Sequence, residues 1–363
     1  MGTSFKNITA DDVTTTRTLL HENIPLTGTL VSGTYGVNGT ATAFPNEENI
    51  KNYSHGMFQS VYDYPYLSSS ANHIFDITVG YSSGSAIAAS TNTQHEKKRN
   101  IYNQMAQVLM GNDVTGAIQL FDEDGDITGG GTKLTSCVFL NFSRLLTKDE
   151  IKKGETSLQF LTGGATPIGS LASSLMTLVD ASASTDYRIN SPAGEYGILY
   201  QQYTTNPKGL IYYQAGIAVL TSSVFSNFSA SSDFTGSVAN EDSNNNQTIL
   251  HITGVLTGST IRQAADCLRH RVHNISFNNT TELNSTIYFC RANHNEFNYS
   301  SNPTYLSASK VFVKENNLDV PVAYATTVGL YSADNELMAV AKLSEPLKKT
   351  PNNEITLKVR LDY

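Results

Sequence analysis

The last ten residues constrain the fold of this chain most strongly. After Glu354, apolar and polar side chains alternate strictly: Ile355, Leu357, Val359, Leu361 and Tyr363 against Thr356, Lys358, Arg360 and Asp362. A period of two is typical of a β-strand that places one face against a core and the other toward water or a neighbouring chain. We therefore expect a half-buried strand at the end of the chain.

Two further strands are expected just before it. Residues 322–331 and 336–343 are largely apolar, and the Asp334 and Asn335 between them tolerate left-handed turn conformations, so the two runs predict a hairpin. The next connection, residues 344–353, contains Pro346 and Pro351 and is expected to be neither strand nor helix. The three strands together predict a C-terminal β-meander.

The rest of the chain also favours sheets. Charged residues make up only 15% of a sequence with 19 Tyr and no Trp, and Thr, Tyr, Val and Ile suit a pleated, half-buried surface. Residues 196–203 and 209–220 predict a second hairpin. Helical spacing predicts a helix at 260–273 and another at 94–110, with Ile101, Met105, Val108 and Leu109 on its apolar face. We therefore predict a mainly β protein, with β-sandwich or meander sheets and two short-to-medium helices.

Composition changes along the chain predict its organisation. Residues 1–55 are polar and poor in apolar clusters, which predicts an extended N-terminal arm that is either disordered or ordered on a neighbouring subunit. The Gly- and Thr-rich stretch at 161–169 is the best candidate for an internal boundary. We therefore expect a β-rich domain with one helix at 56–165. A second β-rich domain, at 166–363, would hold the short helix and the meander.

An acidic segment is the first candidate metal site. Asp122, Asp124 and Asp126 stand at positions 1, 3 and 5 of a pattern that resembles a calcium loop. Two positions depart from that pattern, because Ile127 replaces the glycine at position 6 and Lys133 replaces the bidentate glutamate at position 12. The sequence therefore favours a turn between strands and leaves an incidental cation open.

Cysteine and histidine residues form the second candidate site. Cys267, His270 and His273 are followed by Cys290 and His294, residue types that suit zinc. On a helix, however, His273 is rotated from Cys267 by about 120°. The favoured interpretation is a buried thiol near surface histidines, so we predict no metal and no cofactor. With Cys137, the chain has three cysteines and no export signal, which predicts free thiols.

Charge and motif content exclude several classes of function. A net charge of −8 argues against binding nucleic acid over the whole surface, and no apolar run approaches the length of a membrane span. The N-terminus lacks the pattern of a secretory signal. Glycine loops for phosphate, the Gly-x-Ser-x-Gly elbow and the His-Glu-x-x-His pair are all missing from the sequence. We expect a protein that is not an enzyme, although a carboxylate pair for polysaccharide hydrolysis stays open.

Some segments resemble structural proteins of tailed bacteriophages. Residues 327–346, which contain Gly329-Leu-Tyr before the turn and Ala339-Val-Ala after it, are similar, with the terminal 359–363, to hairpins of phage tail and baseplate-associated proteins. Residues 58–66, 100–109 and 144–154 are similar to large virion proteins of contractile-tailed marine phages. None of these segments contains a catalytic motif.

This resemblance implies a structural protein of the phage tail, baseplate or neck, made in the host cytoplasm and located in the virion. Its expected partners are copies of itself and other virion proteins. A receptor-binding or glycan-binding tail protein is one alternative, which the absence of Trp disfavours. A capsid decoration protein is another, since it would share the β content and the lack of catalytic motifs.

Overall fold

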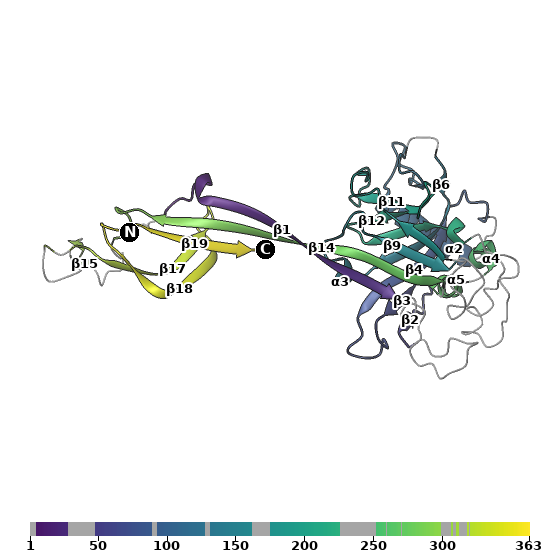
Figure 1. Ribbon diagram of the computed structural model, residues 1–363, viewed down its shortest axis with the longest axis horizontal. Helices are drawn as coiled ribbons and strands as arrows, with labels where there is room; N and C mark the ends of the chain where they lie inside the picture. Colours follow the sequence, from purple (N-terminus) through teal and green to yellow (C-terminus); the bar gives the residue numbers. More distant parts are fainter. Residues whose placement is uncertain are drawn as a thin grey trace. The chain divides into compact units, whose positions relative to one another are not determined.

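Antiparallel strands dominate this protein, as the computed structural model shows (Figure 1). The structure describes residues 5–27, 48–88, 93–127, 131–161, 175–225, 252–258, 260–269, 271–298, 306–307, 310–311, 318 and 320–363. The chain divides into a central unit, Leu20–Thr281, and a terminal unit made of Met1–Leu19 and Glu282–Tyr363. The prediction of a mainly β fold is confirmed.

One antiparallel sheet forms the frame of the central unit. Its strands follow the order β14-β9-β10-β11-β12-β13-β7-β4-β3-β2. Their bounds are β2 Ile50–Asn52, β3 Gln59–Tyr62, β4 His73–Tyr81, β7 Ser136–Phe142, β9 Ser157–Leu161, β10 Leu175–Val179, β11 Tyr196–Gln201, β12 Pro207–Tyr212, β13 Ile217–Thr221 and β14 Val272–Ala292. Strands β4, β7 and β13 are buried along most of their length, so both faces of the sheet are covered there.

Short strands complete the central unit. β8 (Glu150–Ile151) pairs with β14, while β5 (Phe121–Asp122) and β6 (Lys133–Leu134) pair with each other in a separate ribbon. The predicted second hairpin is present as β11 and β12. The run 209–220 is divided between β12 and β13 by a turn in which Gly216 has a φ of 67°.

Four α-helices occur in the described part of the chain: α2 Thr93–Leu109, α3 Arg144–Thr147, α4 Ile252–Gly258 and α5 Ile261–Arg269. Two 3-10 helices, η1 (Ala10–Asp12) and η3 (Ser222–Phe225), accompany them. The two predicted helices are present as α2 and α5, although α5 ends at Arg269 and His273, the predicted end, lies in β14. Helix α4 packs against α5 (Figure 1).

Helix α2 packs closely against β4. A Cβ atom added at Gly80 of β4 would lie 2.8 Å from the carbonyl oxygen of Lys98 and 2.9 Å from the backbone nitrogen of Tyr102. The predicted apolar face of this helix is partly wrong, since Val108 is 64% exposed. The buried face instead contains Tyr102 and Ala106, together with the polar His95 and Lys98, which concealed it in the sequence pattern.

The terminal unit contains β17 (Ala323–Tyr331), β18 (Leu337–Lys349) and β19 (Ile355–Asp362), with the short β15 (Leu306–Ser307) and β16 (Lys310–Val311). The predicted hairpin of β17 and β18 is present, and Asn335 in its turn has a φ of 62°. Strand β19 pairs with β14, from Ser285 opposite Asp362 to Ala292 opposite Ile355. The third strand of the expected meander therefore lies on β14, and not on β18.

The alternation has the predicted effect within β19, whereas Tyr363, the last residue of the predicted apolar row, is 74% exposed. The apolar residues of β19 are half-buried and its polar residues are exposed along the whole strand. The prediction for residues 344–353 is wrong in part, since β18 continues through Pro346 to Lys349. Ala325 is opposite Leu347 and Thr327 is opposite Lys342, so Pro346 lies in an irregularity where the ladder is interrupted. Proline cannot donate a backbone hydrogen bond to the ladder, so it is tolerated at a position where the ladder is interrupted.

Strand pairing also crosses the expected domain boundary near residue 165. β9, before that boundary, pairs with β10 after it, and β7 pairs with β13. Within the expected arm, β1 (Val13–Thr27) is a strand next to β14, and residues 28–47 lie outside the described residues. In the described part of the chain, no helix is both long enough and apolar enough to span a membrane.

Candidate functional site

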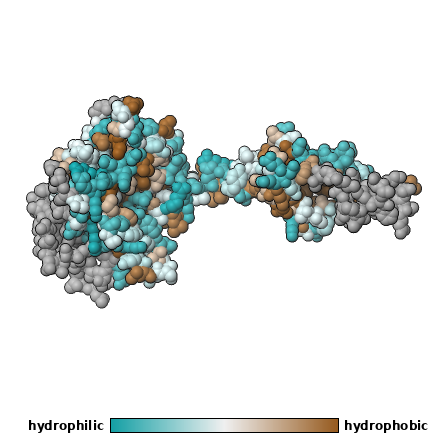
Figure 2. Space-filling model, turned by 180° about the vertical axis from the view of Figure 1, so that it is seen from behind, coloured by the Kyte–Doolittle hydropathy of each residue, from teal (hydrophilic) through white to brown (hydrophobic). Residues whose placement is uncertain are grey.

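The terminal unit leaves large apolar side chains at its surface. Among its described residues, the only buried hydrophobic side chain is Leu330. Met338 is 71% exposed and Val340 is 55% exposed, and Tyr331 and Leu337 are exposed as well. Hydrophobic residues, in brown, are visible at the surface of this unit in Figure 2. Such exposure in one small unit is typical of a surface that contacts another protein.

These side chains share one face of the β17–β18 hairpin. Val340 is opposite Gly329 and Leu337 is opposite Tyr331, and Met338 lies at the irregularity of the ladder between these two pairs. A Cβ at Gly329 would lie 2.9 Å from Cε2 of Tyr331 and 3.2 Å from Cδ1 of Leu337, so both side chains cover this glycine. The ring centroid of Phe5 lies 4.9 Å from the ring centroid of Tyr331. We call Phe5, Tyr331, Leu337, Met338 and Val340 the hairpin patch.

Strand edges add to this surface. Among the described strands, β17 and β18 pair only with each other, and β19 pairs only with β14. Each of these three strands therefore has one edge with backbone N–H and C=O groups that no described strand pairs. Edges of this kind can add a strand from another chain.

The three aspartates of the acidic segment converge, as their spacing suggested. Their carboxylate oxygens lie within 4.8 Å of one another, with Asp122 buried and Asp124 and Asp126 exposed. Asp122 is the last residue of β5, and Lys133 is the first residue of β6. The Lys133 ammonium forms an ion pair with Oδ2 of Asp122 and donates a hydrogen bond to the carbonyl oxygen of Ile127, at 3.2 Å.

Among the residues that the structure describes, the cysteine and histidine candidates do not form a cluster that could hold a metal ion. Cys267 lies in α5 of the central unit, whereas Cys290 lies on β14 in the terminal unit. His294 contacts Oε1 of Glu354 at 3.2 Å through Nδ1. The side chain of Cys267 and the whole of His270 lie outside the described residues, and His273 lies at the start of β14.

Two of the cysteines have the predicted free thiol. Cys137 is buried in β7 and Cys290 is half-buried, and neither forms a disulfide. Burial raises the pKa of both thiols above the ordinary range. Both therefore stay protonated at neutral pH, which disfavours nucleophilic or metal-binding roles.

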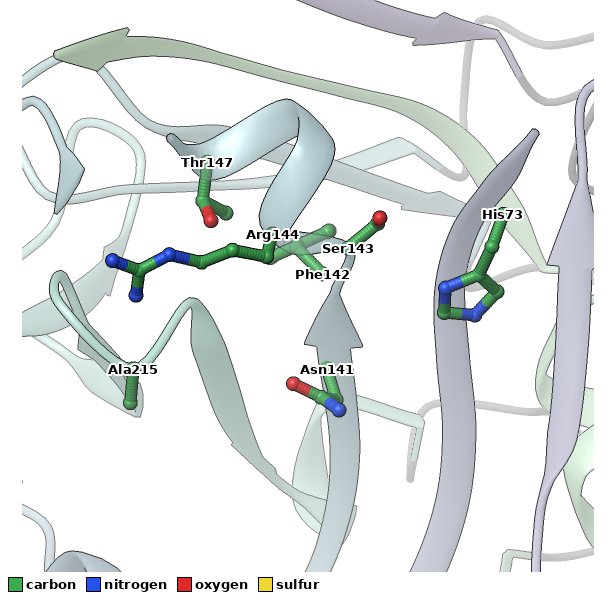
Figure 3. Close-up of a pocket in the computed structure, with 7 residues that line it drawn as sticks. All are labelled: His73, Asn141, Phe142, Ser143, Arg144, Thr147 and Ala215. Atoms are coloured by element: carbon green, nitrogen blue, oxygen red, sulfur yellow. The ribbon is translucent and has the colours of Figure 1, made fainter. Parts of the chain in front are cut away.

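A surface pocket of about 270 Å³ was not predicted from the sequence (Figure 3). His73 lies on one side of it, and the Arg144 side chain extends on the side of Ala215. His73 is held by Asp76, with 2.8 Å between Nε2 and Oδ1. The hydroxyl of Ser143 accepts a hydrogen bond from the backbone of Leu145 and so caps α3. The residues that line the pocket come from three separate parts of the chain, at His73, between Asn141 and Thr147, and at Ala215. No local sequence pattern could therefore reveal this pocket.

Known proteins give no further guide to these surfaces. Comparison of the chain with protein-family models, with curated protein sequences and with solved structures gives no match. The functional argument therefore depends on the residues and their geometry. Of the surfaces described, the hairpin patch is the one formed by exposed apolar side chains.

Proposed function

We propose that this protein is a non-enzymatic structural component of a tailed-phage particle. It would assemble through protein–protein contacts in the tail, baseplate or neck, with copies of itself and other virion proteins as partners. It would be made in the host cytoplasm and end in the virion. The observation that best supports this proposal is the hairpin patch, because residues 327–346, which resemble phage tail hairpins, form the second half of β17 and most of β18.

The physical basis of assembly is the burial of this patch. An exposed apolar side chain gains about 1.5–3 kcal/mol when it is fully buried. Several such residues on one face, next to strand edges that no described strand pairs, provide both apolar contact and main-chain hydrogen bonds. Tyr and Phe add large contact area at modest cost in side-chain entropy. Repetition of the contact around a symmetric particle would multiply the effect of each weak interaction.

Substitution of Val340 or Met338 by aspartate tests this proposal. Either change places a charge in the hairpin patch and should reduce incorporation into particles by roughly tenfold to a hundredfold, the equivalent of about 1.5–3 kcal/mol. Incorporation would be measured by quantitative mass spectrometry of purified particles after complementation with each variant. Both side chains are exposed, so the isolated protein should remain folded.

The matched control is Leu67→Asp, because Leu67 is 87% exposed but belongs to the central unit. This variant should be incorporated as well as the unmodified chain. Equal incorporation of Val340→Asp, Met338→Asp and Leu67→Asp would show that the hairpin patch has no part in assembly.

A further inference from the structure

We infer that Asp122, Asp124 and Asp126 form a binding site for a divalent cation, and that this cation is Ca²⁺. The site lies in the central unit, at the end of β5 where the chain leaves that strand toward β6. It is independent of the hairpin patch and of the proposed role in assembly. The inference rests on an unsatisfied buried oxygen, on the spacing of the carboxylates, on the backbone of the loop and on local charge.

The unsatisfied oxygen belongs to Asp122. This residue is completely buried, and while its Oδ2 is paired with Lys133, its Oδ1 has no hydrogen-bond partner. Leaving a buried carboxylate oxygen without a partner is unfavourable, because the oxygen has lost its hydration. A bound cation would compensate for that loss. Lys133 therefore fixes the carboxylate of Asp122 through one oxygen and leaves the other for a ligand.

The spacing of the oxygens suits one calcium ion. Ca²⁺ binds oxygen ligands at about 2.3–2.6 Å, so two oxygens on the same ion lie at most about 5 Å apart. The three carboxylates satisfy this limit, with one oxygen from each within 4.8 Å of the others. A Cβ added at Gly131 would lie 2.9 Å from Oδ1 of Asp122 and 2.9 Å from both oxygens of Asp124. Oδ1 of Asp122 and the carboxylate of Asp124 therefore border the same space, which the absence of a side chain at residue 131 leaves open.

The first departure from the calcium-loop pattern is the missing glycine at position 6, and the backbone conformation compensates for it. Position 6 of such a loop is normally glycine because the chain turns sharply there. Ile127 occupies this position with a φ of 60°, the left-handed conformation that favours glycine. The turn is thus formed without the glycine. Lys133 stands at position 12 in place of the expected glutamate ligand, and its ion pair orients the carboxylate of Asp122.

Charge favours a divalent ion. Three carboxylates and one ammonium group leave two formal negative charges among these four side chains. All donors are carboxylate oxygens, which are typical ligands of Ca²⁺ and Mg²⁺ and poor ligands for softer metals. Ca²⁺ tolerates irregular geometry and further ligands from water and carbonyl groups, whereas Mg²⁺ requires a near-ideal octahedron.

Bound calcium should stabilise the central unit. The carbonyl oxygen of Gly125, within the loop, accepts hydrogen bonds from Nδ2 of Asn190 at 3.1 Å and from the hydroxyl of Tyr196 at 3.3 Å. Tyr196 is completely buried in β11. A cation bound by these aspartates is therefore coupled to the core through Asn190 and Tyr196, and binding to the folded state raises the stability of the central unit.

The test is a calcium titration of the full chain after removal of metal with a chelator. We expect a melting temperature that rises with CaCl₂ concentration and a saturable heat of binding in calorimetry. The variants Asp124→Asn and Asp126→Asn should fold, because both side chains are exposed, and should lose at least tenfold in calcium affinity. Gly131→Ala should lose binding too, since its Cβ would crowd the ligand oxygens.

Asp334→Asn is the matched control, because Asp334 is an exposed carboxylate in the turn of the β17–β18 hairpin. It should respond to calcium as the unmodified chain does. No calcium response in the unmodified chain at millimolar concentration would overturn the inference. An unchanged response of Asp124→Asn and Asp126→Asn would overturn it as well, and an equal affinity for Mg²⁺ would overturn the assignment to calcium.

Discussion

Replacement of Arg269 by methionine is expected to destabilise the central unit by about 3–5 kcal/mol. Arg269 is completely buried at the end of α5, where it forms an ion pair with Asp266 and donates from Nε to Oε1 of Gln59 on β3 at 3.4 Å. Without the guanidinium group, the carboxylate of Asp266 would remain almost fully buried but would lose this positive charge. Helix α5 contacts β3 and β4, so the loss would weaken its attachment to the sheet.

Chemical denaturation of the full chain measures this effect. Arg262→Met is the matched control, because Arg262 lies on the same helix but is exposed, and its replacement should change the free energy of unfolding by less than about 0.5 kcal/mol. Combining Arg269→Met with Asp266→Leu should recover part of the stability, since the buried charge is then removed. A single Arg269→Met variant within 1 kcal/mol of the unmodified chain would be inconsistent with this role.

Deletion of residues 354–363 is expected to abolish incorporation into particles and to make the protein poorly soluble. These residues contain β19, which pairs with β14 from Ser285 to Ala292 and ends with two hydrogen bonds between Asn284 and Tyr363. Removal would expose that edge of β14 and the apolar surface that the half-buried row of β19 contacts. Particle composition and the soluble fraction of the expressed protein measure the effect.

Two neighbouring substitutions separate the faces of this strand. Leu357→Asn changes the half-buried row and should lower the stability of the terminal unit by about 1–2 kcal/mol, whereas Lys358→Asn changes the exposed row and should have little effect. Normal assembly of the truncated chain would refute the importance that we assign to β19. Equal effects of the two substitutions would refute its predicted orientation.

The sequence predicts local features of this fold well and long-range features poorly. The alternation after Glu354 correctly predicts a strand with one half-buried face, because strand periodicity is a local property. It does not reveal that β14 is the partner of β19, since pairing depends on residues about seventy positions away. The path of β18 through Pro346 depends on an interruption of the ladder with β17, which is equally non-local.

The same contrast between local and long-range features applies to the candidate sites. Asp122, Asp124 and Asp126 are close in sequence, so their convergence could be anticipated from spacing alone. The role of Lys133 and the unsatisfied oxygen of Asp122 could not, because they depend on the pairing of β5 with β6. The hairpin patch could be predicted only in part. The sequence predicts its strands, but the exposure of Val340 and Met338 depends on what packs on each face of the hairpin.

Localisation of the chain in purified phage particles by cryo-electron microscopy tests the central proposal most directly. We expect density that fits this chain in the tail, baseplate or neck, with the hairpin patch covered by a neighbouring subunit. Density on the head surface would instead favour a capsid decoration protein. Absence of the chain from purified particles would contradict the proposed structural role.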